Sequence, residues 1–98
     1  MSNIFWLSFA YNEVMTVYEE FVRKRITQLR LKKGISEYKM SYDLGHSRGY
    51  IYNISSGKAL PPLKEFFVIC DYFGLTPQQF FDEGTQNPEL VQKAIEGL

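Results

Sequence analysis

The sequence has very few residues that could build a covalent or metal-bound framework. Among 98 residues there is one cysteine, Cys70, and one histidine, His46. A single cysteine excludes a disulfide within the chain, and these two residues cannot supply the ligands of an ordinary zinc site. We expect no metal and no cofactor, a Cys70 that is buried as a small hydrophobic residue, and a His46 that lies exposed at a turn.

Long apolar runs and catalytic groupings are also missing. The apolar stretch at residues 4–11 is far shorter than the roughly 18 residues of a membrane span. It also lacks the basic flank and the small-residue cleavage site of a signal peptide. Paired carboxylates, a nucleophile with a neighbouring base and a glycine-rich phosphate loop are not found. We therefore expect a cytoplasmic protein that is neither an enzyme nor a membrane protein.

The chain has no net charge, but its charges are segregated. Eleven basic and eleven acidic residues give a formal net charge of zero at pH 7. Residues 1–22 carry −3, residues 23–64 carry +8 and residues 65–98 carry −5. A basic segment of this kind points to a nucleic-acid partner, although solvated helix faces that complement the helix dipoles would give a similar distribution.

Capping residues and glycines divide most of the chain into helices. The expected N-caps are Thr16, Ser36, Ser47 and Thr76, and the first and last of these form capping boxes with Glu19 and Gln79. Glycines that can take the left-handed conformation follow four of the apolar segments. Because no segment shows sustained period-two alternation, we predict an all-α fold. Its helices are expected at residues 17–33, 37–44, 48–55, 63–73, 77–81 and from 87 to the end.

These helices suggest three parts of the chain. Residues 1–15 are an N-terminal extension, for which a strand-like arm, a helical extension and a segment that wraps the core all remain open. Residues 16–83 form the helical domain, in which Val17, Phe21, Val22, Ile26 and Leu29 give the first helix one buried face. Residues 84–98 form a C-terminal helix that could serve dimerisation.

The segment 36–56 has the pattern of two helices joined by a tight turn. Ser41 is small where the second helix must come close to the third, and Gly45 can take a turn conformation that a residue with a Cβ resists. The apolar residues that would fix the angle between the two helices are Met40, Leu44, Ile51 and Ile54.

Together these positions resemble the lambda-repressor/Cro-like (XRE-type) helix-turn-helix family. The pattern is Ile35-Ser36-x3-Met40-Ser41-x2-Leu44-Gly45-x-Ser47-x3-Ile51-x2-Ile54-x2-Gly57-Lys58, followed by Pro62-Leu63 and Phe73-Gly74-Leu75-Thr76. The match covers roughly residues 23–82 without a gap. The resemblance implies a five-helix DNA-binding domain whose third helix, at about residues 47–55, lies in the major groove.

The resemblance also implies roles for single residues. Arg48, Gly49, Tyr50 and Asn53 become the candidates that face the bases, with Arg48 suited to guanine and Asn53 to adenine. The candidates for phosphate contacts are Ser36, Glu37, Ser47, Tyr52 and Lys58. Ser47 can instead be only a helix cap, and Tyr50 and Tyr52 can instead face a protein partner or the core.

The sequence departs from the family pattern at two positions. The family often has a glutamine where this chain has Glu37, whose charge repels a phosphate unless a base such as Arg48 neutralises it. Family members often pair the arginine at position 30 with an acid late in the third helix, where this chain has Ser55. Arg30 is then free for solvent, for Asp43 or for DNA.

The resemblance implies sequence-specific binding of double-stranded DNA by a small repressor-like regulator that acts as a homodimer. Phe80, Phe81, the N-terminal arm and residues 87–98 are the expected dimer surfaces. The alternative is a protein-interaction module with a helix-turn-helix fold, such as an antitoxin, that has weak or lost DNA affinity. Glu37 and the tyrosines near the third helix favour this alternative, and the basic segment argues against it.

Overall fold

The computed structural model describes residues 2–85 and residue 96, with side chains described for residues 17–82 and 96. Five helices follow one another: α1 (Ser2–Lys33), α2 (Glu37–Asp43), α3 (Tyr50–Ser55), α4 (Leu63–Tyr72) and α5 (Pro77–Thr85). No strand occurs within residues 2–85. The predicted all-α, lambda-repressor-like architecture is confirmed.

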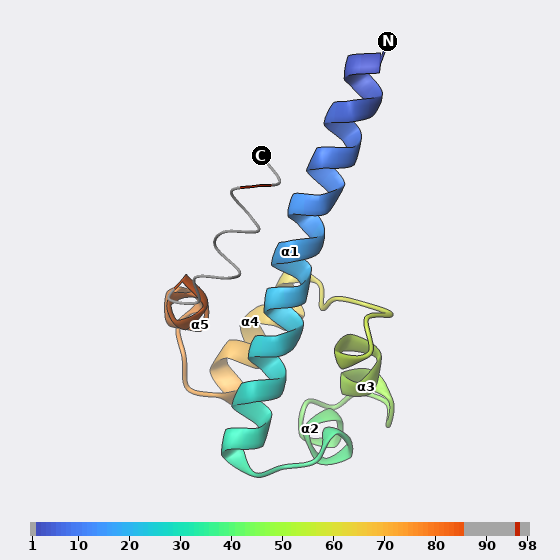
Figure 1. Ribbon diagram of the computed structural model, residues 1–98. Helices are drawn as coiled ribbons and strands as arrows, with labels where there is room; N and C mark the ends of the chain where they lie inside the picture. Colours follow the sequence, from blue (N-terminus) through green and yellow to red (C-terminus); the bar gives the residue numbers. More distant parts are fainter. Residues whose placement is uncertain (1, 86–95, 97–98) are drawn as a thin grey trace.

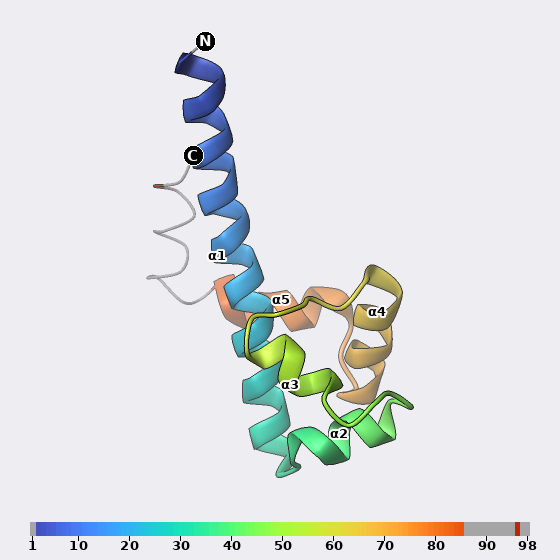
Figure 2. The same ribbon diagram turned by 90° about the vertical axis from the view of Figure 1, so that its right-hand side faces the viewer.

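The C-terminal half of α1 is the helix on which two of the other helices pack directly. It contacts α3 and α5, while α2 packs on α3 and α4 on α5. Figure 1 accordingly shows α2 and α3 on one side of this half and α4 and α5 on the other. Both views show the N-terminal half of α1 projecting beyond these four helices (Figures 1 and 2).

The start of α1 corrects the sequence prediction. The helix begins at Ser2 and not at Val17, so the N-terminal extension is a helical one. A capping box at Thr16 needs a non-helical backbone there. However, residues 2–16 contain neither glycine nor proline, so no residue in this stretch stops the helix. In addition, the boundary expected between residues 15 and 16 falls inside α1, and that between 83 and 84 falls inside α5.

Other helix ends follow the predicted signals closely. Ser36 caps α2 by accepting a 3.0 Å hydrogen bond from the Lys39 amide. Thr76 and Gln79 form the predicted capping box, with side chain-to-amide bonds of 3.1 and 2.9 Å. The four glycines expected to end helices have φ angles between 69° and 92°. The helix α5 continues to Thr85, past the predicted end at Phe81. The C-terminal helix expected from residue 87 lies outside the described residues, apart from residue 96.

One core joins all five helices. Its fully buried residues are Ile26, Met40, Ile51, Ile54, Ile69, Cys70 and Phe80, with Phe66 at the margin. The predicted burial of Cys70 is confirmed, and so is the apolar face of α1. Val17 and Ile26 are buried on that face, and Phe21, Val22 and Leu29 are partly buried. No described helix is long and apolar enough to cross a membrane.

Arg25 links α1 to α5 from inside the domain. Its side chain is buried, and its Nε donates a 2.8 Å hydrogen bond to the Phe80 carbonyl. The Nη2 atom donates to the Gln79 carbonyl at 3.4 Å, and the guanidinium lies 5.8 Å from the centre of the Phe80 ring. A buried guanidinium needs such acceptors, because an unpaired buried charge is costly. This residue therefore fixes where α5 crosses α1.

Candidate nucleic-acid interface

The contact between α2 and α3 is built around Ser41. This side chain is fully buried. Its hydroxyl donates to the Glu37 carbonyl at 2.8 Å and accepts from the Ile51 amide at 3.1 Å. The Ile51 amide lies in the first turn of α3, where amides have no partner within the helix. Ser41 thus satisfies an otherwise open amide and sets the distance between the two helices. The sequence predicted its small size but not this bond.

The turn between α2 and α3 depends on a glycine. Gly45 has a φ of +74°, in the left-handed region that a residue with a Cβ resists. Its amide donates to the Tyr42 carbonyl at 3.0 Å, which closes the end of α2. The chain can therefore reverse within a few residues and bring α3 back against α2.

The start of α3 differs from the prediction. The helix begins at Tyr50 after Gly49 as N-cap, and it has no side-chain capping bond. Ser47 contributes its backbone carbonyl, which accepts from the Tyr50 amide at 3.1 Å and forms a turn. The prediction that Ser47 caps a helix starting at Arg48 is wrong, because this turn holds Arg48 and Gly49 outside the helix.

His46 and Tyr50 form a stacked pair behind this turn. Their ring centres are 3.8 Å apart and the rings are nearly parallel, at 6°. His46 also makes a 2.8 Å hydrogen bond to Glu65 of α4, and its side chain is 29% exposed. The prediction of an exposed His46 is therefore wrong. The Tyr50 hydroxyl is buried, so the structure does not place it with the exposed base-facing candidates. Burial raises the pKa of Tyr50, and the charge of Glu65 raises it further.

Five of the predicted contact residues lie exposed on or near α3. They are Ser47, Arg48, Tyr52, Asn53 and Lys58. The Arg48 guanidinium lies 5.5 Å from the centre of the Tyr38 ring, and the Lys58 amine lies 5.8 Å from that of Tyr52. The Lys58 amide donates to the Asn53 carbonyl at 3.0 Å. Aromatic rings position these two cations without neutralising them.

Glu37 is held by Ser55 and not by Arg48. The Ser55 hydroxyl donates to the Glu37 carboxylate at 2.5 Å. This bond joins the first residue of α2 to the last residue of α3. Ser36, which was also predicted to contact phosphate, is exposed, and its hydroxyl accepts from the Lys39 amide.

Arginines of α1 hold backbone carbonyls near the same surface. Arg23 donates to the Ile54 carbonyl at 3.1 Å and to the Gly57 carbonyl at 3.3 Å, which satisfies the C-terminal end of α3. Arg30 donates to the Ile35 carbonyl at 2.7 Å. Arg30, for which solvent, Asp43 and DNA were the predicted alternatives, is thus bonded to the backbone of its own chain, and no role was predicted for Arg23. When an arginine bonds to a carbonyl that is distant in the sequence, no local sequence pattern indicates the bond.

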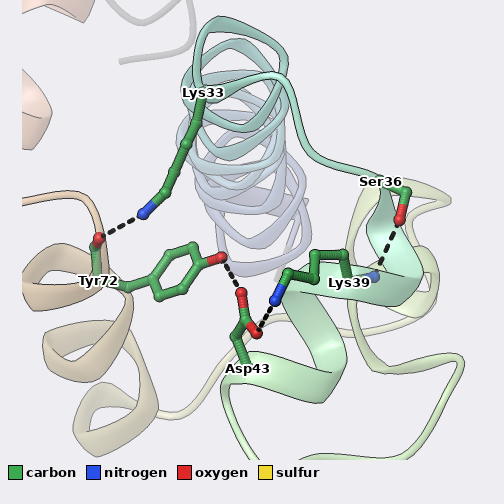
Figure 3. A network of polar contacts seen from close by, with 5 residues as sticks. All are labelled: Lys33, Ser36, Lys39, Asp43 and Tyr72. Carbon is green, nitrogen blue, oxygen red and sulfur yellow. Dashed lines mark hydrogen bonds and ion pairs between the residues drawn. The ribbon is translucent and has the colours of Figure 1, made fainter.

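A polar network joins the ends of α1, α2 and α4 (Figure 3). Asp43 accepts from the Lys39 amine at 2.8 Å and from the Tyr72 hydroxyl at 2.6 Å. Lys33 donates to the Tyr72 carbonyl at 3.3 Å, and its amine lies 4.0 Å from the centre of the Tyr72 ring. The hydrogen bonds from Lys39 and then Tyr72 lower the pKa of Asp43. Burial, followed by Asp43, raises the pKa of Tyr72 to about 12.

This geometry is that of two short helices at a fixed angle. The second helix presents polar side chains, and the basic residues Arg48 and Lys58 lie in the segments just before and after it. Within the described part of the chain, no group of histidine, cysteine and acidic residues could hold a metal ion. The family model of the helix-turn-helix domain matches residues 24–84. The chain belongs to the helix-turn-helix family. The match is to domains of the XRE/lambda-repressor type, which are DNA-binding regulatory modules. Comparisons with curated proteins and with solved structures gave no significant match.

The family match places the domain within the structure. It begins in the second half of α1 and ends one residue before the end of α5. The helix-turn-helix unit itself consists of α2, the turn at Gly45 and α3. The N-terminal half of α1 lies outside the matched range.

Proposed function

We propose that this protein binds double-stranded DNA sequence-specifically as a small transcriptional regulator, with the segment 47–55 in the major groove. The observation that carries the proposal is the way α3 is held. Ser41 fixes its first turn, Arg23 and Glu37 hold its last turn, and the side chains of Tyr52 and Asn53 stay exposed between them. A reading helix needs this combination, because base contacts require a fixed orientation.

Arg48 and Asn53 are the residues we assign to base reading. Asn53 follows Gly49 by one helical turn, and the backbone amide of Asn53 donates to the Gly49 carbonyl at 2.9 Å. An asparagine side chain can pair with the edge of adenine, and an arginine fork can pair with guanine. Gly49 lets the backbone approach the bases. Tyr50 supports the reading helix from behind by stacking on His46.

Phosphate contacts are assigned to Ser36, Ser47, Tyr52 and Lys58. All four are exposed, and Lys58 carries the positive charge that phosphate binding requires. The carboxylate of Glu37 is an unsuitable phosphate ligand, so only its backbone amide, in the first turn of α2, could serve. The proposal therefore combines one strong phosphate contact with several neutral ones.

A salt series on DNA binding tests the proposal. Affinity for a selected duplex should fall by about 0.9 log units per log unit of salt for each phosphate that is neutralised. Lys58→Ala should weaken binding to all sequences alike and reduce this slope. Asn53→Ala should weaken binding to the preferred sequence by about 1–3 kcal/mol and relax the preference. Absence of binding to duplex DNA at low salt would refute the proposal.

The second candidate is a protein-interaction module, favoured by the exposed tyrosines of α2 and α3. Tyr38, Tyr42 and Tyr52 are 53%, 71% and 54% exposed. Tyrosines are enriched in protein interfaces because they combine a large apolar ring with a polar tip. Under this alternative Tyr42→Ala would abolish capture of the partner. Under the DNA-binding proposal it would leave the preferred sequence unchanged.

A homodimer that binds DNA would present two reading helices about 34 Å apart, one turn of the duplex.

A further inference from the structure

The N-terminal half of α1 is a helix without a partner among the other described helices. Residues 2–16 continue α1 as an uninterrupted helix, and this part projects beyond α2, α3, α4 and α5 (Figures 1 and 2). Isolated helices of about 12–15 residues are only marginally stable in water, even with good helix-forming residues. This segment is instead rich in aromatic and polar residues of lower helix propensity. A stable helix here therefore calls for a packing partner.

The sequence of this half has the spacing of a coiled-coil seam. Five apolar residues recur at alternating intervals of three and four positions, which places these five positions on one face of the helix. We name this face the α1 stripe, and its residues are Ile4, Leu7, Tyr11, Val14 and Tyr18. Phe5, Trp6, Phe9 and Met15 fall outside this spacing. The positions of Phe5 and Phe9 are followed at helical spacing by the polar residues Asn12 and Thr16.

The α1 stripe runs into exposed aromatic surface on the folded domain. Tyr18, its last residue, is 55% exposed. The next position in the same spacing is Phe21, which stacks on Phe81 with ring centres 5.7 Å apart. Phe81 is itself 41% exposed. The spacing of the stripe therefore leads along α1 to the edge where α1 meets α5.

We propose that the α1 stripe binds the α1 stripe of a second copy of this chain, so that two α1 helices pair as a short coiled coil. An apolar stripe with a period of 3.5 residues packs against another helix whose apolar residues have the same period. A second copy of this chain supplies such a helix. Charge is compatible with self-association, because Glu13 is the only charged residue before Glu19 and it lies outside the stripe. Two copies thus meet without like charges in the seam.

The available apolar area is sufficient for a specific pair. A stable interface removes about 1,200–2,000 Å² in total from water, or about 600–1,000 Å² per copy. One buried aromatic side chain contributes about 150–250 Å². The two tyrosines and three aliphatic residues of the α1 stripe therefore reach the lower end of this range, and Phe81 extends it. The same face serves both copies, as two-fold symmetry requires.

Sedimentation equilibrium of the full chain tests this pairing without any DNA. The wild-type protein should sediment at twice the monomer mass at micromolar concentration. Val14→Glu should raise the dissociation constant at least about a hundredfold, because each copy would then bury an unpaired carboxylate. Thr16→Glu is the matched control: it adds the same charge two residues away, on the opposite face of α1, and should leave the dimer intact.

Thermal unfolding separates this pairing from burial of the stripe within one chain. The melting temperature of the wild type and of Thr16→Glu should rise with protein concentration, and that of Val14→Glu should not. A wild-type chain that is monomeric at micromolar concentration would overturn the proposal. Equal dissociation constants of the two variants, or dissociation by Thr16→Glu alone, would overturn it as well. DNA binding enters none of these readouts, so the proposed function stands or falls separately.

Discussion

The hydroxyl of Ser55 donates a 2.5 Å hydrogen bond to the carboxylate of Glu37. These are the two positions at which the sequence departs from the lambda-repressor-like pattern, with an acid in place of glutamine and a hydroxyl in place of an acid. The two departures pair with each other, because an acceptor at position 37 and a donor at position 55 join α2 to α3. Arg30, the arginine that the family pattern pairs with position 55, donates to the Ile35 carbonyl instead.

Glu37→Gln should increase affinity for duplex DNA. The glutamine amide oxygen can still accept from Ser55, so the joint survives, and a negative charge near the phosphates is removed. We expect an increase of up to about tenfold, which corresponds to about 1.4 kcal/mol. Fluorescence anisotropy on one duplex at two salt concentrations measures it. Ser55→Ala is the control, since it breaks the bond but leaves the charge. Weaker binding by Glu37→Gln would show that the carboxylate itself contributes to the interface.

Ser41→Ala should destabilise the domain more than its small change in volume suggests. The hydroxyl is the acceptor for the Ile51 amide, and alanine would leave that buried amide unsatisfied. The free energy of unfolding should fall by about 1–3 kcal/mol. Chemical denaturation of Ser41→Ala and of Ser47→Ala, whose side chain is exposed, gives the comparison. Equal effects of the two substitutions would contradict this role of Ser41.

Elements set by neighbouring residues were predictable from the sequence. Ser36 and Thr76 cap their helices through bonds to amides three residues away, and a local pattern contains both partners. The same holds for the glycine turns and for the core face of α1. The fold class followed from these signals, because short helices at fixed spacings allow few packings.

Contacts between distant residues were not predictable in this way. Arg23 and Ile54 are 31 positions apart, and Arg25 and Phe80 are 55 apart. No spacing rule indicates which carbonyl an arginine will reach. The prediction also failed at Thr16 and Ser47, where a local cap signal competed with helix continuation and with a backbone turn. Five of the candidate contact residues are exposed, and their contacts with DNA remain predictions. The stacking of Tyr50 on His46 was not predicted.

Tyr72 makes the stability of the domain sensitive to alkaline pH. Its pKa in the folded protein is raised from 10.0 to about 12, by burial and by its bond to Asp43. Between these values the unfolded chain releases the proton and the folded chain retains it. The stabilisation is therefore complete below pH 10 and is lost as the pH rises toward 12. Tyr72→Phe should remove the part of the loss of stability between pH 10 and 12 that the ionisation of Tyr72 causes.

Chemical denaturation of the wild type and Tyr72→Phe at several pH values between neutral and 11 measures the difference. Tyr50, whose pKa is also raised, contributes in the same direction, so some decline should remain in Tyr72→Phe. Tyr42→Phe serves as the control, because this tyrosine is 71% exposed and substitution there should leave the wild-type profile unchanged. Parallel profiles for the wild type and Tyr72→Phe would exclude Tyr72 as the source.

Two adjacent basic residues of α1 should differ sharply in their effect on stability. Arg25→Ala removes the buried donor to the Phe80 and Gln79 carbonyls and should cost about 2–3 kcal/mol, because hydrogen bonds from charged donors in buried sites are the stronger ones. Lys24→Ala removes an exposed pair with Glu20, whose atoms are 3.8 Å apart. This should cost at most about 0.5 kcal/mol.

Urea denaturation of both variants tests the contrast, and hydrogen exchange locates it. In Arg25→Ala the amides of α5 should exchange faster than those of α2 and α3, because the link between α1 and α5 is lost while the Ser41 joint remains. In Lys24→Ala the exchange pattern should match the wild type. If the two variants lost equal stability, the helix α5 would be held by its apolar contacts with Phe21 and Phe66 alone, and Arg25 would have no positioning role.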